Sequence, residues 1–244
     1  MVDLIDENGI RIDGRKLDEM RPIKIEVDVV ENADGSAYIE FGGNKIIAAV
    51  YGPREVHPKW MMQTNKAILR CTYHMSPFST DTRKNPAPSR REKEISKVIR
   101  EALEPAIILE DYPRTAIDVF IEILQSDGGS RCAGVTVASV ALSDAGINMR
   151  DIVSACAAGK IDGKVVLDLS DIEDQKGQAD MPIAILPNLN EVTLLQLDGI
   201  ITPSEFKDIF NLATSGAKKL YEIQKDSLLK KYFGKDATVQ EVSN

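Results

Sequence analysis

The chain has 244 residues, and 30 Lys and Arg against 38 Asp and Glu give it a formal net charge of −8 at pH 7. A chain of this length buries a substantial core without disulfide support. Its 43% hydrophobic and 28% charged residues exclude collagen-like, coiled-coil and wholly disordered proteins. The acidic balance disfavours a protein that binds nucleic acid over its whole surface, because phosphate contacts need a local excess of Lys and Arg. Any nucleic-acid site must therefore be a local patch.

The first third of the chain is predicted to form strands. Alternating and β-branched residues begin at residue 23, and Gly-containing dipeptides at 34–35 and 42–43 are typical of hairpin turns. The run 65–75 continues with strand-forming residues. Three prolines in 77–89 then predict a loop.

The middle of the chain alternates helix and strand. Ser89 is predicted to begin an amphipathic helix, with Ile95, Ile99 and Leu103 among the residues of its apolar stripe. Residues 115–124 alternate between apolar and polar side chains and predict a strand. The small, apolar run 132–147 predicts a buried helix that packs closely on a sheet.

The last third repeats this plan. Two strands are predicted to meet at a turn at 162–163, and two more follow an acidic interruption in runs 181–188 and 191–199. Thr202 and Glu205 form a capping box with Pro203 at the first helical position, which predicts a long C-terminal helix. Residues from about 234 to 244 are expected to be frayed.

The order of elements favours an α+β fold with mixed sheets. There are too few helices for a doubly wound sheet, and the chain divides into two halves of similar plan, each a sheet followed by a helix. No change of composition marks a linker. We therefore predict a single domain over residues 1–244, with residues from about 10 to 22 as a segment leading into it.

Cysteine and histidine content excludes several kinds of site. The three cysteines, Cys71, Cys132 and Cys156, form no CxxC pair and are predicted to be buried, reduced thiols. With only His57 and His74 available, the chain has too few histidines for a Cys/His zinc site or a His-centred triad. The N-terminus is polar and no apolar run reaches membrane-spanning length. We expect a cytoplasmic protein with no membrane partner.

The first motif with chemical potential is Asp127-Gly128-Gly129-Ser130-Arg131, between a predicted strand and a predicted helix. Backbone N–H groups at a helix N-terminus bind anions, and adjacent glycines allow close approach. Ser130 adds a hydroxyl group, and Arg131 adds a forked cation. A glycine-rich turn with a serine helix cap is the structural alternative.

The second motif is a pair of arginines, Arg90 and Arg91, in the first turn of the helix that follows Ser89, with Arg83 and Lys84 just before it. Cations at a helix N-terminus oppose the helix dipole, so a bound polyanion explains them directly. A solvated face with Glu92 and Glu94 as ion-pair partners explains them equally well.

The third motif is the acidic run 168–180. Asp174 and Asp180 flank Gly177, which permits a tight turn that brings the two carboxylates together. Paired carboxylates hold a divalent metal or act as general acid and base. Solvated loop acids are the alternative. Together the three motifs indicate chemistry at a phosphate group.

Four segments of the chain resemble the ribonuclease PH family, and its exosomal branch in particular: IRIDGRKLDEMRPI, PFSTDTRKNPAPSRRE, LQSDGGSR and EDQKGQADMPIA. They follow the family order from about residue 10 to the end of the last helix. The resemblance implies the ribonuclease PH fold, an α+β duplication. It also implies phosphate-dependent 3′→5′ degradation of RNA to nucleoside diphosphates, with the reverse reaction adding tails.

The resemblance implies roles for the motif residues. Gly129, Ser130 and Arg131 would hold inorganic phosphate, the co-substrate, and Arg90 and Arg91 would grip the RNA. The resemblance implies that Asp174 is the family's essential acid. It implies that Asp180 either orients Asp174 or shares a divalent cation with it. The chain departs from related polynucleotide phosphorylases at Pro182, where those carry a lysine as metal partner. Mg²⁺ is therefore expected to enter mainly on substrate phosphates, with Asp174 and Asp180 as the residues that would hold it.

The resemblance also implies partners. An exosomal subunit would form a six-membered ring with an inactive paralogue, bind RNA 3′ ends and carry RNA-binding cap proteins. Arg83 and Lys84 would contact RNA, and His57 and Lys59, with Trp60, are candidates for a narrow channel neck, although an exposed loop with a half-buried tryptophan fits them equally. Two alternatives are a stand-alone ribonuclease PH that trims tRNA 3′ ends and a non-catalytic, RNA-binding ring subunit.

Overall fold

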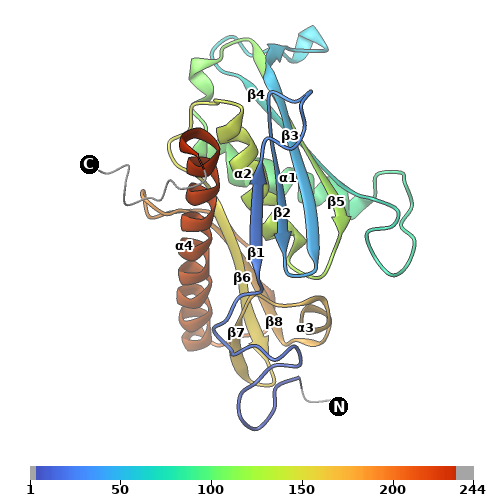
Figure 1. Ribbon diagram of the computed structural model, residues 1–244, viewed down its shortest axis with the longest axis vertical. Helices are drawn as coiled ribbons and strands as arrows, with labels where there is room; N and C mark the ends of the chain where they lie inside the picture. The colour runs from blue at the N-terminus through green and yellow to red at the C-terminus, as the bar shows by residue number, and fades with distance from the viewer. Residues whose placement is uncertain (1–3, 235–244) are drawn as a thin grey trace.

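The computed structural model describes residues 4–234, and the predicted frayed tail lies, apart from Gly234, outside the described residues (Figure 1). The described strands are β1 (Ile23–Val27), β2 (Gly35–Phe41), β3 (Asn44–Glu55), β4 (Ile68–Met75), β5 (Thr115–Gln125), β6 (Ser154–Ile161), β7 (Lys164–Leu167), β8 (Ala179–Leu186), β9 (Glu191–Leu195) and β10 (Asp198–Gly199). The described α-helices are α1 (Arg90–Leu103), α2 (Ser130–Asp144), α3 (Asp171–Lys176) and α4 (Pro203–Phe233). Three short 3-10 helices complete them: η1 (Lys59–Met61), η2 (Glu104–Ala106) and η3 (Leu109–Asp111).

The first half of the chain forms a five-stranded mixed sheet in the order β1-β2-β3-β5-β4. Its neighbouring strands are antiparallel except β4 and β5, which run parallel. The turn between β2 and β3 falls at Gly42-Gly43, as predicted. Apolar residues of alternate positions, such as Ile39, Ile46 and Ile121, are fully buried against the helices.

Helix α2 lies at the centre of the molecule, packed between the two sheets, and is buried on nearly every side. The small residues predicted for this helix allow a close approach to β2. A Cβ atom at Gly35 would lie 2.2 Å from the backbone nitrogen of Ala145, so only glycine fits there. The close packing fixes α2, and with it the turn that precedes the helix.

The second half forms another five-stranded sheet, in the order β10-β8-β6-β7 with β9 paired to β8. The turn at Asp162-Gly163 joins β6 and β7, as predicted. Helix α4 begins at its predicted capping box and runs along this sheet and past β1 (Figure 1). Gln224 on its inner face donates to the carbonyls of Thr136 and Val153, so a polar side chain ties α4 to α2 and to the residue just before β6.

One hydrophobic cluster extends through both halves. It joins buried residues of the first sheet, α2, the second sheet and α4. The prediction of mixed sheets in two halves of similar plan is confirmed by the two five-stranded sheets, each followed by a helix. The surface between the halves is where the predicted motifs converge.

The acidic interruption contains an element that the sequence reading missed, the short helix α3. Ser170 and Glu173 form a capping box at its start, in which the Glu173 carboxylate accepts bonds from the backbone N–H and the hydroxyl of Ser170. Helix α3 has only six residues, which is too short to show a helical repeat of apolar side chains. The capping box was the only local signal for it.

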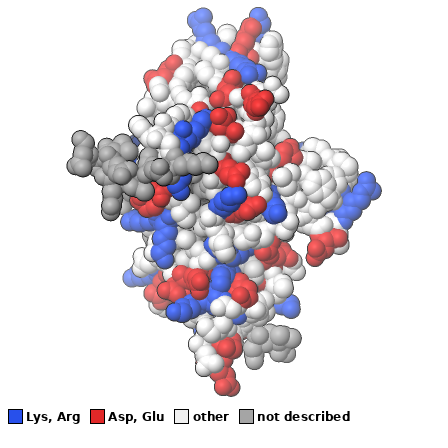
Figure 2. Space-filling view, viewed as in Figure 1, with Lys and Arg blue, Asp and Glu red and all other residues white. Residues whose placement is uncertain are grey.

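Charges of both signs are interspersed over the face seen in Figure 2. The net charge of −8 is therefore compatible with local cationic sites. The loop between β4 and α1, which carries Arg83 and Lys84, projects from the body of the molecule (Figure 1).

Candidate active site

A cleft of about 610 Å³ opens where the two halves meet. Its walls come from the β5–α2 turn, α1, α3, β8 and the connection between β9 and β10. Six of the residues that the sequence analysis singled out line this one cleft: Arg91, Gly129, Ser130, Arg131, Asp174 and Asp180.

The turn between β5 and α2 packs closely against the start of α3. Gly128 and Gly129 both have positive φ, and a Cβ at Gly128 would lie 2.6 Å from the backbone nitrogen of Asp171. Gly129 is the N-cap of α2, and no side chain caps the helix, so the first-turn N–H groups face the cleft free of a capping bond. Ser130 is not the cap; its hydroxyl hydrogen-bonds the Tyr73 hydroxyl at 2.8 Å. This is an anion-binding geometry.

The first turn of α1 supplies Arg91 to the opposite wall. Ser89 caps the helix in a capping box with Glu92, as predicted for a helix entered at this serine. The Glu92 carboxylate accepts bonds from the backbone N–H groups of Ser89 and Met75, so it is used in capping and is no partner of the arginines. Arg91 thus brings a cation into the cleft without a neutralising Glu92.

Asp174 and Asp180 enter the cleft from two elements that Gly177 joins. Asp174 lies near the end of α3, Gly177 ends that helix, and Asp180 lies near the start of β8. In the pairing of β8 with β10, Asp180 is opposite Asp198, a further carboxylate of the same cleft.

Both carboxylates have perturbed acidity. Burial, together with the neighbouring charges of Asp174 and Asp198, raises the pKa of Asp180 to about 7, although Arg131 opposes the shift. Enclosure in the cleft also raises the pKa of Asp174, with Arg91 opposing and Asp171 reinforcing the shift. Such a pair retains a proton near neutral pH, as a general acid requires.

The N-terminal segment holds the walls of the cleft in place through a buried arginine. Arg21 is buried and its guanidinium donates to both oxygens of Asp168, at 2.9 and 2.6 Å. The same group donates to the carbonyls of Asp127 and Gly128 and to that of Leu169. One side chain therefore ties the anion-binding turn to the segment that leads into α3.

A second buried arginine fixes α3 itself. Arg11 forms a two-point contact with the carboxylate of Glu173, and both side chains are fully buried. Burial would raise the pKa of Glu173, but the bonds from Arg11 and Ser170 lower it. Arg15 adds a bond to Asp168 at 3.2 Å. From the sequence, this segment was described as leading into the domain, and none of these supporting contacts was predicted.

Gln196 is a further cleft residue that the sequence reading missed. Its side-chain oxygen accepts a hydrogen bond from Nη1 of Arg131. A lone amide side chain between leucines on a predicted strand gives no distinctive signal in a sequence. Only the folded chain brings it opposite Arg131.

The remaining predicted cations divide into two groups. Lys84 lines a second cleft of about 570 Å³ that shares Arg91, Ser126 and Ser130 with the first. Arg83 and Arg90 are exposed and line neither cleft.

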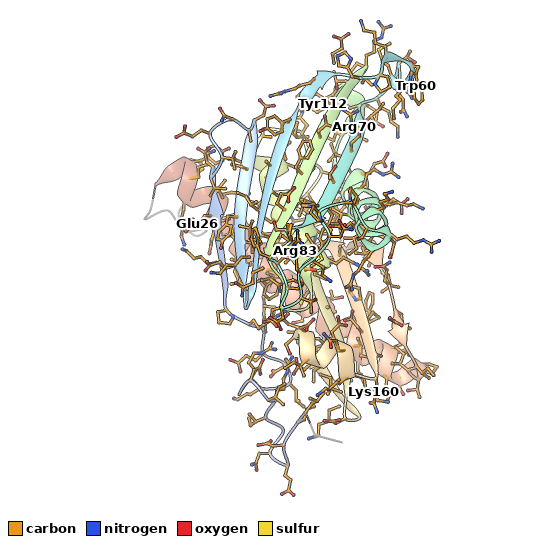
Figure 3. The ribbon with its side chains drawn as sticks, turned by 90° about the vertical axis from the view of Figure 1, so that its right-hand side faces the viewer. Glu26, Trp60, Arg70, Arg83, Tyr112 and Lys160 are labelled. Carbon is orange, nitrogen blue, oxygen red and sulfur yellow. The ribbon has the colours of Figure 1, made fainter. Side chains whose placement is uncertain are left out.

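The segment proposed for a channel neck lies at the far end of the molecule. His57 and Lys59 are exposed beside η1, which Figure 3 places, with Trp60, at the end away from the second sheet. Lys59 pairs with Glu55 at 3.0 Å. Trp60 is 82% exposed, so the alternative of a half-buried tryptophan is wrong.

The thiols have no catalytic setting. The cysteines are free, and burial raises the pKa of each well above its usual range. Cys132 lines the cleft but is 2% exposed and follows Arg131 within α2. His74 pairs with Glu122 at 2.7 Å, which raises its pKa.

Comparison with known families assigns the chain. Residues 19–148 match the 3′ exoribonuclease family, domain 1, and residues 151–216 match domain 2 of the same family. The chain belongs to the RNase PH, or 3′ exoribonuclease, family. The predicted fold is thereby confirmed, and the cleft lies where residues of the two RNase PH regions meet.

Curated relatives and solved structures agree with this membership. The chain is 62% identical over 231 residues to the exosome complex component Rrp41 of Cenarchaeum symbiosum, covering 95% of each chain. It is 63% identical over 229 residues to Rrp41 of Pyrococcus abyssi, covering 94% of this chain and 92% of that protein. Rice Rrp46 shares the fold with a TM-score of 0.82 at 21% identity, over 90% of this chain and all of that one. A chain of the Archaeoglobus fulgidus exosome with RNA bound to the active site shares it with a TM-score of 0.77 at 22% identity, over 88% and 92% of the two chains.

None of the described helices combines the length and apolar character needed to cross a membrane.

Proposed function

We propose that this chain is the catalytic subunit of an exosome-type complex, a phosphate-dependent 3′→5′ exoribonuclease that releases nucleoside diphosphates and can run in reverse to add RNA tails. The observation that carries the proposal is the convergence of an uncapped glycine-rich helix start, two arginines and two carboxylates of raised pKa in one cleft. The Rrp41 relatives are named components of exosome complexes, which supports the assignment to such an assembly.

The cleft residues divide the reaction between them. The N–H groups at Gly129, the Ser130 hydroxyl and the Arg131 guanidinium hold inorganic phosphate. A phosphate oxygen attacks the terminal phosphodiester phosphorus, the bond from phosphorus to the 3′ oxygen of the preceding nucleotide breaks, and the nucleoside diphosphate leaves. Arg91 offsets the charge that develops on the attacked group.

The departing 3′ oxygen needs a proton, and the carboxylate pair supplies it. Asp174 is the more exposed member and delivers the proton to the oxygen. Asp180, deeper in the cleft, would orient Asp174, and the nearby charge of Asp174 raises the pKa of Asp180. The raised pKa of Asp180, about 7, keeps a proton on the pair to near neutral pH.

A divalent cation fits the same pair. Oδ1 of Asp180 is buried and has no hydrogen-bond partner among the described residues, which suits a cation ligand. The described residues contain no cluster of three or more His, Cys, Asp or Glu side chains arranged to hold a metal. As an alternative to donating a proton, the ionised forms of Asp174 and Asp180 would hold a Mg²⁺ together with water and substrate phosphate. The ion would neutralise phosphate charge.

We propose that RNA reaches the cleft past the cations outside it. Lys84 lines the adjoining cleft, and Arg83 and Arg90 lie exposed on the loop and helix next to it. His57 and Lys59, at the far end, would contact RNA farther from its 3′ end. An assembled ring with an inactive paralogue and RNA-binding caps would thread the RNA along this path. The three free thiols are consistent with action in the cytoplasm.

Product analysis of the full chain, co-expressed with the RNase PH-like subunit encoded in the same genome, tests the activity. Nucleoside diphosphates should appear only when phosphate is added, and Asp174→Ala should abolish them while RNA binding is retained, because the variant removes the acid and leaves the cationic contacts. Monophosphates without added phosphate, or an active Asp174→Ala variant, would refute the proposal.

Size-exclusion chromatography of the chain alone tests the assembly. The exosome assignment predicts that the fully active ring needs the second subunit. A stable and fully active homohexamer of this chain would instead support a stand-alone ribonuclease PH.

A further inference from the structure

The position of Arg131 in α2 does not by itself fix the direction in which its guanidinium points. Its guanidinium lies in a cleft lined by five carboxylates, which attract it away from an incoming anion: Glu94, Asp171, Asp174, Asp180 and Asp198. The nearest carboxylate of α1, on Glu94, is 3.9 Å from Nη2 of Arg131 and makes only a loose ion pair. Nε of Arg131 is buried and has no hydrogen-bond partner among the described residues. Another group must therefore set the direction of the fork.

Gln196 is the group in contact with that fork. It lies in the connection between β9 and β10, and its backbone N–H donates to the carbonyl of Pro182 at 3.2 Å. Its side-chain oxygen then accepts from Nη1 of Arg131. The contact between Gln196 and Arg131 joins the second sheet to the first turn of α2 across the cleft. Pro182, which binds the backbone of Gln196, lies two residues after Asp180 in β8.

An amide suits this position for two reasons. A neutral oxygen holds the guanidinium without neutralising it, so the cation keeps its full charge for an anion. The Gln196 amide nitrogen makes no hydrogen bond within residues 4–234 and therefore offers further donors in the same cleft. A carboxylate at this position would form an ion pair with Arg131 and repel the anion.

We propose that Gln196 is a positioning residue that aims Arg131 at inorganic phosphate and sets the affinity of the cleft for it. The proposal rests on the function proposed above, since it requires that phosphate be the attacking substrate. It assigns Gln196 a role in phosphate binding and none in proton transfer.

The test compares Gln196→Glu and Gln196→Met in the ring assembled with the co-expressed subunit. We expect the KM for phosphate to rise by roughly ten-fold or more in Gln196→Glu and by a few-fold in Gln196→Met, because a charged partner competes with the anion and an apolar one only releases the fork. The kcat at saturating phosphate should stay within about three-fold of the wild type. The matched control is Gln63→Glu, the same change on an exposed residue outside the cleft.

Failure of the positioning role of Gln196 can be distinguished from failure of the proposed phosphorolytic function. A KM for phosphate that is unchanged in Gln196→Glu overturns the positioning role, and so does a loss of kcat with an unchanged KM in both variants. Melting temperatures equal to that of Gln63→Glu would show that the fold is intact. A wild-type ring that degrades RNA without phosphate would refute the proposed function itself, whatever the Gln196 variants do.

Discussion

The carboxyl group of Asp180 is buried near another negative charge, and both effects raise its pKa. Its pKa is raised from 3.8 to about 7, so the ionised carboxylate is less stable in the folded protein than in the unfolded chain. Between these two values the folded state binds more protons, and the stability of the protein falls as pH rises. The cleft is thus built at the expense of stability, as expected for a functional site.

Asp180→Asn should reveal this cost. The neutral amide removes the ionisation, so we expect a higher melting temperature than the wild type at about pH 8 and a difference that vanishes near pH 4, where both side chains are neutral. Activity should fall sharply. Thermal melts at the two pH values measure the effect, with Asp208→Asn on the exposed face of α4 as the control. A difference that is the same at both pH values would contradict the assigned acidity.

The sequence identified the glycines, the arginines and two of the carboxylates of the cleft individually, because arginines at a helix start, paired glycines and spaced aspartates each carry a local chemical signal. Gln196 and Asp198 were missed because their significance depends on which side chains the fold places opposite them. Residues that act through a partner are visible only once the partner is known.

At the scale of elements, the loops of the cleft are held by the N-terminal segment. Arg11 and Arg21 are buried against Glu173 and Asp168, and they fix α3 and the anion-binding turn. A long, regular element such as α4 was predictable from its capping box and apolar face. Contacts between residues about 150 positions apart, such as these ion pairs, leave no periodic pattern in the sequence.

The Arg11–Glu173 pair should show strong coupling. Glu173→Gln leaves a buried guanidinium without its counter-charge, and removing one member of a buried pair costs on the order of 3–5 kcal/mol. We expect Arg11→Met combined with Glu173→Gln to lose less stability than the sum of the two single variants, in urea unfolding of the full chain. The exposed pair Lys24–Glu26 is the control, and Lys24→Met with Glu26→Gln should be additive. Additivity at both pairs would show that the buried contact is not a support.

At the scale of the whole molecule, two halves of similar plan share one core and leave their functional groups at the junction. The anion-binding turn and Arg91 belong to the first half, and both carboxylates belong to the second. The duplicated plan was predictable from the order of elements. The cleft was not, because it depends on how α2 packs between the sheets.

The chain has a net charge of −8, and local cations would allow it to bind RNA despite that charge. Arg90→Glu with Arg91→Glu should weaken RNA binding and reduce the slope of log affinity against log salt by about one to two units, since fewer counterions are released. Fluorescence anisotropy at several salt concentrations measures it. Lys218→Glu with Lys219→Glu, the same charge change on exposed residues of α4, is the control. Equal slopes in the two double variants would show that Arg90 and Arg91 do not bind RNA.

The most direct test of the central claim follows the oxygen atoms of phosphate. The assembled ring would be given RNA and inorganic phosphate labelled with heavy oxygen, and the mononucleotide products would be analysed by mass spectrometry. Attack by phosphate predicts that the terminal phosphoryl group of each nucleoside diphosphate carries the label, and that Asp174→Ala yields no labelled product. Unlabelled nucleoside monophosphates as the product would show that water is the nucleophile and would contradict the account.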